Sequence, residues 1–203
     1  TVSVQNLANV ATGARVDVSI PKHLDLGVVT APAHRTRNGV TWSGTLTPAL
    51  PPTVTSVDPG QGPAGGYLPL GAIGIPPTPG FDDETMSNFS VPAFSFGGET
   101  YTSVGVDSNG YVVVGGGTSA DNECCTISSF PNPSRPNNVI APFWTDLNPG
   151  AGGTVTVAVV TDGTTDWLVA DWNKVVAYGS TVENSFEVWI QLGATEGQWM
   201  SYG

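Results

Sequence analysis

Glycine and proline occur in this chain at a density that few fold classes tolerate. The sequence holds 26 glycines and 17 prolines in 203 residues, about a fifth of the chain, against about an eighth in an average protein. Nine of the prolines lie between Pro48 and Pro79. Because proline and glycine both destabilise helix interiors, the chain is predicted to be all-β, with helix in less than about a tenth of its residues against the usual third.

Residues 1–57 carry the pattern of a small β unit. Apolar and polar side chains alternate as half-buried strands require, in four runs at residues 1–6, 14–20, 40–46 and 53–57. Four strands fall short of the roughly seven strands and 100 residues of an immunoglobulin sandwich. We therefore expect residues 1–57 to form a partial immunoglobulin-like sandwich.

Residues 58–88 have the composition of a connector. Their seven glycines and six prolines exclude a central strand. Tyr67, Leu68, Leu70 and Ile73 nevertheless make the segment too apolar for a solvated linker. We predict a packed connector that lies extended on a protein surface, with these side chains tucked in, and that resists proteolysis.

Residues 89–203 contain eight short strand-like runs. Such a density predicts an antiparallel β-sandwich. The pairs Asn109-Gly110 and Asp162-Gly163 predict hairpin turns, because these residues accept the positive φ of tight turns. The runs lie at residues 93–96, 101–106, 111–114, 139–143, 155–161, 167–172, 185–192 and 198–202.

The charge of the chain is strongly negative and uneven. The formal net charge is −11, and residues 58–203 hold fifteen acidic but only two basic side chains. A phosphate backbone or an anionic membrane is therefore an unfavourable partner, and no apolar run reaches the length of a membrane-spanning helix. We expect no nucleic-acid binding, no membrane insertion, and a secreted or cell-surface bacterial protein, because low Lys with abundant Thr, Ser, Asn and Gly is typical of that class.

The sequence offers no convincing catalytic constellation. A hydrolytic triad needs a nucleophile, a base and an orienting acid, and the only histidines are His23 and His34. They lie beside Lys22 and Arg35, and no Gly-x-Ser-x-Gly motif accompanies them. We interpret both as exposed loop residues and expect the chain alone to hydrolyse neither casein nor peptide esters.

Clustered acidic side chains offer a candidate calcium site. Carboxylate and amide oxygens are the ligands that Ca²⁺ prefers. The candidate ligands are Asp82, Asp83 and Glu84, although their spacing does not match an EF-hand loop. Turn formation and solvation are the favoured interpretation of these residues, and no other cofactor is expected.

Cys124 and Cys125 are the only cysteines, and they are adjacent. Neighbouring Cα atoms lie about 3.8 Å apart, below the roughly 4.4 to 6.8 Å of an ordinary disulfide, so a bond between them closes a strained ring. A zinc site would need further Cys or His ligands nearby, which the sequence lacks. Three redox states are open: free thiols, bridges to another chain, and the favoured vicinal disulfide that stiffens the loop.

Trp189 is the candidate ligand-contact residue among six tryptophans. Strand alternation places it with Glu187 and Gln191 on the face opposite the core. If exposed, this stripe suits a sugar or an extended polypeptide, because an aromatic ring flanked by polar groups gives both apolar contact and hydrogen bonds. Packing of Trp189 beneath the connector or the neighbouring unit is the favoured alternative.

Several segments resemble nidogen-like extracellular domains. The pattern comprises an aromatic-Gly strand, an exposed Ser-Asn-Gly turn, an Ala-Pro-Phe-Trp-x-Asp segment, and late Phe-x-Val-Trp and Tyr-Gly strands. Residues 94–98, 106–111, 141–146, 185–190 and 199–203 supply these pieces in order. The resemblance implies a nidogen-like β-sandwich over residues 89–203.

A second resemblance covers nearly the whole chain. Residues 63–70, 121–125 and 135–146 are similar to the C-terminal region of secreted bacterial subtilisin-family serine peptidases, and residues 11–21 resemble an immunoglobulin-like repeat of bacterial surface proteins. The catalytic domain of that peptidase family, with its His and Ser motifs, is absent here. The resemblance implies an accessory region whose full-length parent is a serine-type endopeptidase.

We therefore expect a non-catalytic C-terminal module of a secreted subtilisin-like peptidase, for substrate or cell-surface attachment or for enzyme stabilisation. Its expected partners are the upstream peptidase domain and a protein substrate or cell-surface component of neutral or basic charge. The alternatives are a structural or adhesive surface protein with no protease attached and a carbohydrate-binding module.

Overall fold

The computed structural model describes residues 12–19, 34–36, 39–46, 53–57, 60–125 and 133–203. The chain divides into two compact units, Thr1–Ala49 and Leu50–Gly203. The strand expected at residues 1–6, residue His23 and the side chain of His34 lie outside what is described. Within the described part, no helix is long and apolar enough to cross a membrane.

The first unit contains a three-stranded antiparallel sheet in the order β1-β3-β2, formed by β1 (Thr12–Ser19), β2 (His34–Thr36) and β3 (Gly39–Leu46). The register pairs the Cα positions of Val16 with Trp42 and of Val18 with Val40, so the alternating apolar positions of the two long strands are in register. The strands expected at residues 14–20 and 40–46 are thus confirmed, whereas the immunoglobulin-like assignment stays a prediction.

The fourth expected strand does not belong to the first unit. β4 (Thr53–Ser56) pairs in parallel with β10 (Thr154–Thr161) of the second unit, and the division of the chain falls at residues 49 and 50. The expected boundary at residue 57 is therefore wrong. Alternation identified the strand but carried no information about its partner, which lies about 100 residues later.

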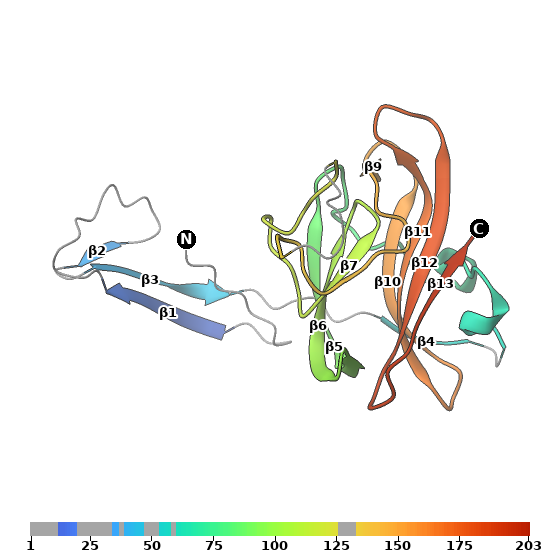
Figure 1. Cartoon of the computed structure of the whole chain (residues 1–203), viewed down its shortest axis with the longest axis horizontal. Coiled ribbons are helices and arrows are strands. Elements are labelled where there is room, and N and C mark those ends of the chain that lie inside the picture. The colour runs from blue at the N-terminus through green and yellow to red at the C-terminus, as the bar shows by residue number, and fades with distance from the viewer. Residues whose placement is uncertain (1–11, 20–33, 37–38, 47–52, 58–59, 126–132) are drawn as a thin grey trace. The chain divides into compact units, whose positions relative to one another are not determined.

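The second unit is a sandwich of two sheets, and they are seen side by side in Figure 1. The larger sheet has the order β13-β12-β11-β10-β4, and β9 also pairs with β11. The smaller sheet has the order β5-β6-β7-β8. Their remaining strands are β5 (Met86–Phe96), β6 (Glu99–Asp107), β7 (Tyr111–Val114), β8 (Val139–Ile140), β9 (Leu147–Asn148), β11 (Asp166–Ala177), β12 (Glu183–Gln191) and β13 (Gln198–Tyr202).

The strand content agrees with the sequence prediction. Each of the eight predicted runs after residue 89 overlaps a strand, although the run at residues 139–143 is a strand only at residues 139–140. Among the described strands, every pairing except that of β4 with β10 is antiparallel. The only helical segments among the described residues are two 3₁₀ turns, η1 (Pro63–Gly65) and η2 (Leu70–Ile73). The all-β fold class is confirmed. The sequence missed β9, which has two residues and therefore no periodicity to detect.

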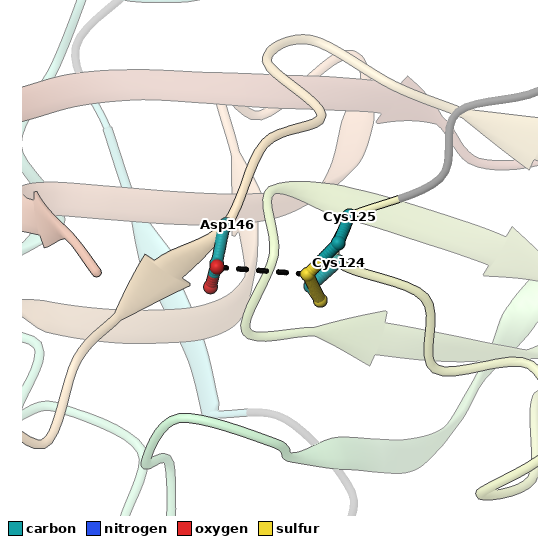
Figure 2. Close-up of side chains that lie close together, drawn as sticks. All are labelled: Cys124, Cys125 and Asp146. Atoms are coloured by element: carbon teal, nitrogen blue, oxygen red, sulfur yellow. Dashed lines mark hydrogen bonds between the residues drawn. A yellow bond between two sulfur atoms is a disulfide. The ribbon is translucent and has the colours of Figure 1, made fainter. Parts of the chain in front are cut away.

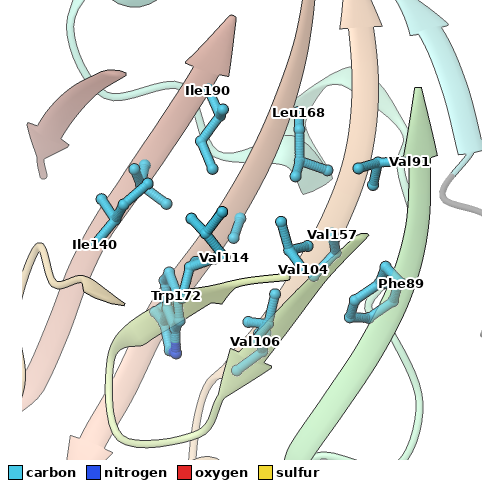
Figure 3. Packing of buried hydrophobic residues seen from close by; sticks show 14 of the residues in the cluster. Phe89, Val91, Val104, Val106, Val114, Ile140, Val157, Leu168, Trp172 and Ile190 are labelled. Atoms are coloured by element: carbon cyan, nitrogen blue, oxygen red, sulfur yellow. The ribbon is translucent and has the colours of Figure 1, made fainter. Parts of the chain in front are cut away.

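The main core lies between the two sheets. Figure 3 shows Phe89, Val104 and Val106 of the smaller sheet pointing toward Val157, Leu168 and Trp172 of the larger one. These are the inward positions of the period-2 pattern, and burying them supplies most of the driving force for folding. Trp172 is also fixed in direction, because its Nε1 donates a hydrogen bond to the carbonyl of Asp107 at 3.1 Å.

A second core lies on the opposite face of the larger sheet. There residues 67–75, which we call the strap, lie on the side of the larger sheet away from the smaller one (Figure 1). Leu70 and Ile75 of the strap are buried in one cluster with Val169 and Trp189 of the sheet. Leu68 and Ile73 are partly buried in the same cluster. The apolar side chains of the proposed connector are thus tucked in as predicted.

Two buried carboxylates attach the strap to the sheet. Asp171 of β11 and Glu187 of β12 are cross-strand neighbours, and both side chains are inaccessible to solvent. Asp171 accepts hydrogen bonds from the Tyr67 hydroxyl at 2.9 Å and the Leu70 amide at 3.0 Å, and Glu187 accepts one from the Leu68 amide at 3.0 Å. Burial raises the pKa of Asp171 to about 6 and that of Glu187 to about 7.

Candidate functional site

The turn between β6 and β7 is the structural centre of one end of the sandwich. Asp107, Ser108 and Asn109 are all fully buried. The Ser-Asn-Gly turn was expected to be exposed, and that expectation is wrong. The turn is covered because its polar groups bind the surrounding loops rather than water: the Asn109 side chain accepts a hydrogen bond from the Leu147 amide at 2.9 Å and donates one to Asn122 at 3.3 Å.

The first loop held by this turn contains residues 117–125. The Tyr111 hydroxyl donates to the carbonyl of Asp121 at 2.6 Å and accepts from the amide of Glu123 at 2.8 Å. The Asp121 carboxylate in turn pairs with Arg135 at 2.9 Å. The loop that carries the two cysteines is therefore anchored to the core immediately before them.

The second loop contains residues 141–148. Besides the bond from Leu147, the amide of Thr145 donates to the carbonyl of Asn109 at 3.2 Å. The Trp144 ring lies 4.5 Å from the Tyr111 ring between centroids, and its Nε1 donates to the carbonyl of Glu123 at 2.7 Å. These contacts tie the second loop to the first loop as well as to the turn.

The two loops bring Asp146 next to the cysteines (Figure 2). Cys124 and Cys125 are joined by a vicinal disulfide, which is the redox state that the sequence favoured. Cys125 Sγ lies 3.6 Å from Asp146 Oδ2. Among the described residues, these three side chains form the only group of at least three potential metal ligands whose ligand atoms lie within 4.8 Å of one another.

The acidic run at residues 82–84 borders the same end. Asp82 Oδ1 accepts hydrogen bonds from the Thr85 hydroxyl at 2.5 Å and from the Glu84 amide at 3.3 Å, so it serves a turn. Burial and the charges of Asp83, Asp146, Glu123 and Asp82 raise the pKa of Glu84. The carboxylates of residues 82–84 do not converge on one point as the cysteines and Asp146 do, and calcium binding there stays a prediction.

The candidate ligand stripe on β12 is not a surface. Trp189 and Glu187 are fully buried beneath the strap, and Gln191 is half-buried. The sequence placed all three on the face away from the main core, which is correct, but exposure of this stripe to a ligand is wrong. Packing beneath the connector, the favoured alternative, is confirmed by the contact of Trp189 with Leu70 in one cluster.

Exposed apolar side chains gather instead beside β13, at the edge of the larger sheet. Met200 and Tyr202 are 45% and 61% exposed, and Phe143 is 40% exposed. Tyr202 is held near Phe143 because its hydroxyl donates to the carbonyl of Pro142 at 2.8 Å, while the Phe143 ring packs on Phe186 at 5.4 Å between centroids. We call Phe143, Met200 and Tyr202 the edge patch.

Sequence reasoning missed both the edge patch and the place of Asp146 beside the cysteines. The edge patch joins residues about 60 positions apart, and Asp146 lies 21 residues after Cys125. Periodicity within a strand cannot reveal such contacts. The one available signal was the aromatic-rich Pro142-Phe143-Trp144 segment, which sequence analysis treated only as part of a pattern.

Comparison with known proteins gives one match. A family model described as NIDO related matches residues 64–198, about two thirds of the chain. No curated protein and no solved structure gives a significant match. The matched range includes the strap, the β6–β7 turn, both loops and the strands of the sandwich from β5 to the first residue of β13, but not β4.

Proposed function

Because the chain belongs to the NIDO-related family, an extracellular type of module, we propose that residues 50–203 serve as a non-catalytic attachment module that binds an extended polypeptide at the edge patch. The observation that carries this proposal is the exposure of Phe143, Met200 and Tyr202 beside an edge strand. Contiguous exposed apolar side chains of this kind are typical of interaction surfaces.

The position of the edge patch favours a polypeptide as the occupant. β13 is the last strand of its sheet, and no described strand pairs with its outer side. An extended chain can add to such an edge through main-chain hydrogen bonds while neighbouring pockets and rings select side chains. Polysaccharides lack the alternating amide groups that this mode of binding uses.

Charge favours a neutral or basic polypeptide. Residues 58–203 contain fifteen acidic and two basic side chains, so an anionic partner would be repelled. The absence of histidine from residues 50–203 removes the usual general base of a hydrolytic triad and supports a non-catalytic role. Collagen-like or Lys-rich proteins are suitable targets, with weak and salt-sensitive binding.

We predict that Tyr202→Ala lowers retention of the full chain on an insoluble, neutral or basic protein at least threefold at low salt. The substitution removes the largest exposed ring of the edge patch. Retention is measured by pull-down on insoluble collagen and, in parallel, on insoluble polysaccharide. Polysaccharide retention that falls with the variant while protein retention does not would favour a carbohydrate-binding module.

Tyr178→Ala is the matched control for this experiment. Tyr178 lies after β11, outside the edge patch, and is 59% exposed, close to the 61% of Tyr202. The control is expected to bind as the parent does. Equal retention of parent, Tyr202→Ala and Tyr178→Ala would contradict attachment through the edge patch.

We further propose that this module belongs to a secreted subtilisin-like serine peptidase, where attachment would hold the enzyme on its substrate or on a cell surface. The support is the similarity of residues 63–70, 121–125 and 135–146 to the C-terminal region of such peptidases. The immunoglobulin-like assignment of residues 1–57 and a bacterial origin belong to the same proposal.

The gene sequence upstream of Thr1 tests the peptidase proposal. We expect it to encode Asp, His and Ser in the Gly-rich motifs of a subtilisin-type catalytic domain. A reading frame that encodes further β-rich repeats and no such domain would contradict the proposal and favour a structural or adhesive surface protein. The pull-down result would be unaffected, because the edge patch lies within the chain described.

A further inference from the structure

The vicinal cysteines and Asp146 form a group whose chemistry depends on the redox state of the sulfur atoms. As a disulfide, Cys124 and Cys125 carry no thiolate and are poor metal ligands. In the reduced state the same position would present two thiolates and one carboxylate from atoms that already lie within 4.8 Å of one another. Two Cys ligands and an Asp ligand suit Zn²⁺ and similar thiophilic cations, with a fourth position left for water.

We propose that residues Cys124, Cys125 and Asp146 form a redox-gated site that binds one thiophilic divalent cation, such as Zn²⁺, when the disulfide is reduced. Sequence reasoning set zinc aside because two cysteines alone supply too few ligands. The tertiary structure adds the third ligand, since Asp146 reaches Cys125 Sγ at 3.6 Å from the other loop (Figure 2).

Both loops that carry this site are held in place by hydrogen bonds to the rest of the sandwich. Glu123, directly before the cysteines, receives a hydrogen bond from Trp144 and gives one to the Tyr111 hydroxyl, and its side chain accepts from the Cys125 amide at 3.1 Å. In the second loop, the carbonyl of Asp146 accepts a hydrogen bond from the Tyr178 amide at 2.9 Å. Such preorganisation keeps the ligands near one another when the disulfide opens.

The surroundings favour a cation and allow it to enter. The charges of Asp83, Asp146, Glu123 and Asp82 all act on Glu84, and those of Asp146 and Asp82 act on Asp83, so several carboxylates surround the site. Cys125 is exposed, and Cys124 and Asp146 are partly exposed, so solvent, a reductant and a metal ion can reach the site.

The site would become able to bind metal in two steps, reduction of the disulfide and then binding of the cation. A dithiol reductant gives two electrons and two protons to the Cys124–Cys125 bond, which breaks to leave two thiols, while the reductant closes its own disulfide. Binding of Zn²⁺ then replaces both thiol protons, which pass to solvent. The disulfide and the metal-bound state therefore exclude each other.

The test uses the full chain, first as the disulfide and then after treatment with dithiothreitol and anaerobic removal of the reductant. Zn²⁺ binding is measured by isothermal titration calorimetry, and Cd²⁺ is added separately to record the near-ultraviolet absorption of a cadmium–thiolate bond. We expect one Zn²⁺ per reduced chain and at least a tenfold lower affinity in the disulfide form. Equal affinity of the two forms would place the cation on the carboxylates alone and would overturn the proposal.

Two variants separate Asp146 from general negative charge. Asp146→Asn is expected to weaken Zn²⁺ binding by the reduced chain at least tenfold. The matched control is Asp166→Asn at the exposed start of β11, which should bind as the parent does. Equal affinity of these two variants would overturn the assignment of Asp146.

A further measurement uses the unchanged chain and does not depend on how a variant folds. Zn²⁺ at saturating concentration should slow alkylation of the reduced cysteines by iodoacetamide at least tenfold, because a metal-bound thiolate is a weaker nucleophile than a free one. Alkylation that proceeds at the same rate with and without Zn²⁺ would overturn the proposal.

Discussion

Raising the pH from 5 to 8 is expected to lower the free energy of unfolding on the order of 3 to 5 kcal/mol, and the melting temperature by about 10 °C. The cause is burial of three carboxyl groups in the second unit. Burial raises the pKa of Asp107 to about 7, that of Asp171 to about 6 and that of Glu187 to about 7.

The sign follows from proton uptake. Unfolded Asp and Glu titrate near pH 4, so between pH 4 and pH 7 the folded chain binds more protons than the unfolded chain. Stability is then complete below about pH 4 and is lost as the pH rises through the folded pKa values. The lowered pKa values of Asp17 and Asp162 act only below this range. Thermal unfolding followed by circular dichroism from pH 4 to 8 measures the effect.

Glu187→Gln tests how much of this pH dependence comes from the buried carboxyl group that binds the strap. It replaces a buried carboxylate beside Asp171 with a neutral amide whose oxygen can still accept from Leu68. The variant is expected to be more stable than the parent at pH 8, by about 1 to 3 kcal/mol, with little difference at pH 5. Glu183→Gln, at the exposed start of the same strand, is the matched control and should leave the pH profile unchanged. A parent whose stability rises from pH 5 to 8 would contradict this account of the buried carboxyls.

Gly110→Ala is expected to lower the free energy of unfolding by about 2 to 5 kcal/mol, or to prevent folding. Gly110 has φ +83°, a conformation that costs an L residue about 1 to 2 kcal/mol. An added Cβ would also collide with the carbonyl oxygen of Phe143 and lie 3.1 Å from the Phe186 ring. The clash is with backbone, which adds about 1 to 3 kcal/mol because the second loop must move.

Gly163→Ala separates the two causes. Gly163 has φ +86° in the hairpin between β10 and β11, but nothing lies within 4 Å of its added Cβ. Only the conformational cost of about 1 to 2 kcal/mol should appear. Urea unfolding at pH 5 measures both variants. Similar costs for the two substitutions would show that the approach of Phe143 to the turn contributes nothing.

Local sequence patterns were sufficient to predict many of the strands and turns of the second unit. The alternation of Phe186, Val188 and Ile190 against Glu187 and Trp189 fixed both the strand and its two faces, because side chains alternate in any β-strand. Asn109-Gly110 and Asp162-Gly163 marked two hairpins through the positive φ that each glycine adopts. The adjacency of Cys124 and Cys125 favoured a vicinal disulfide but left free thiols and bridges to another chain open, and the structure shows the vicinal disulfide.

What these elements do was decided by contacts between distant residues. Trp189 is buried because a strap that begins 122 residues earlier in the chain, at Tyr67, packs against it. Contacts between residues far apart in the sequence also explain the burial of the Ser-Asn-Gly turn, the pairing of β4 with the second unit and the position of Asp146 beside the cysteines. Periodicity and turn chemistry act over a few residues, and so they determine which segments become strands and turns. Which face a strap covers, and which side chains meet at the end of a sandwich, depends on how the sheets pack, and only the tertiary structure contains that information.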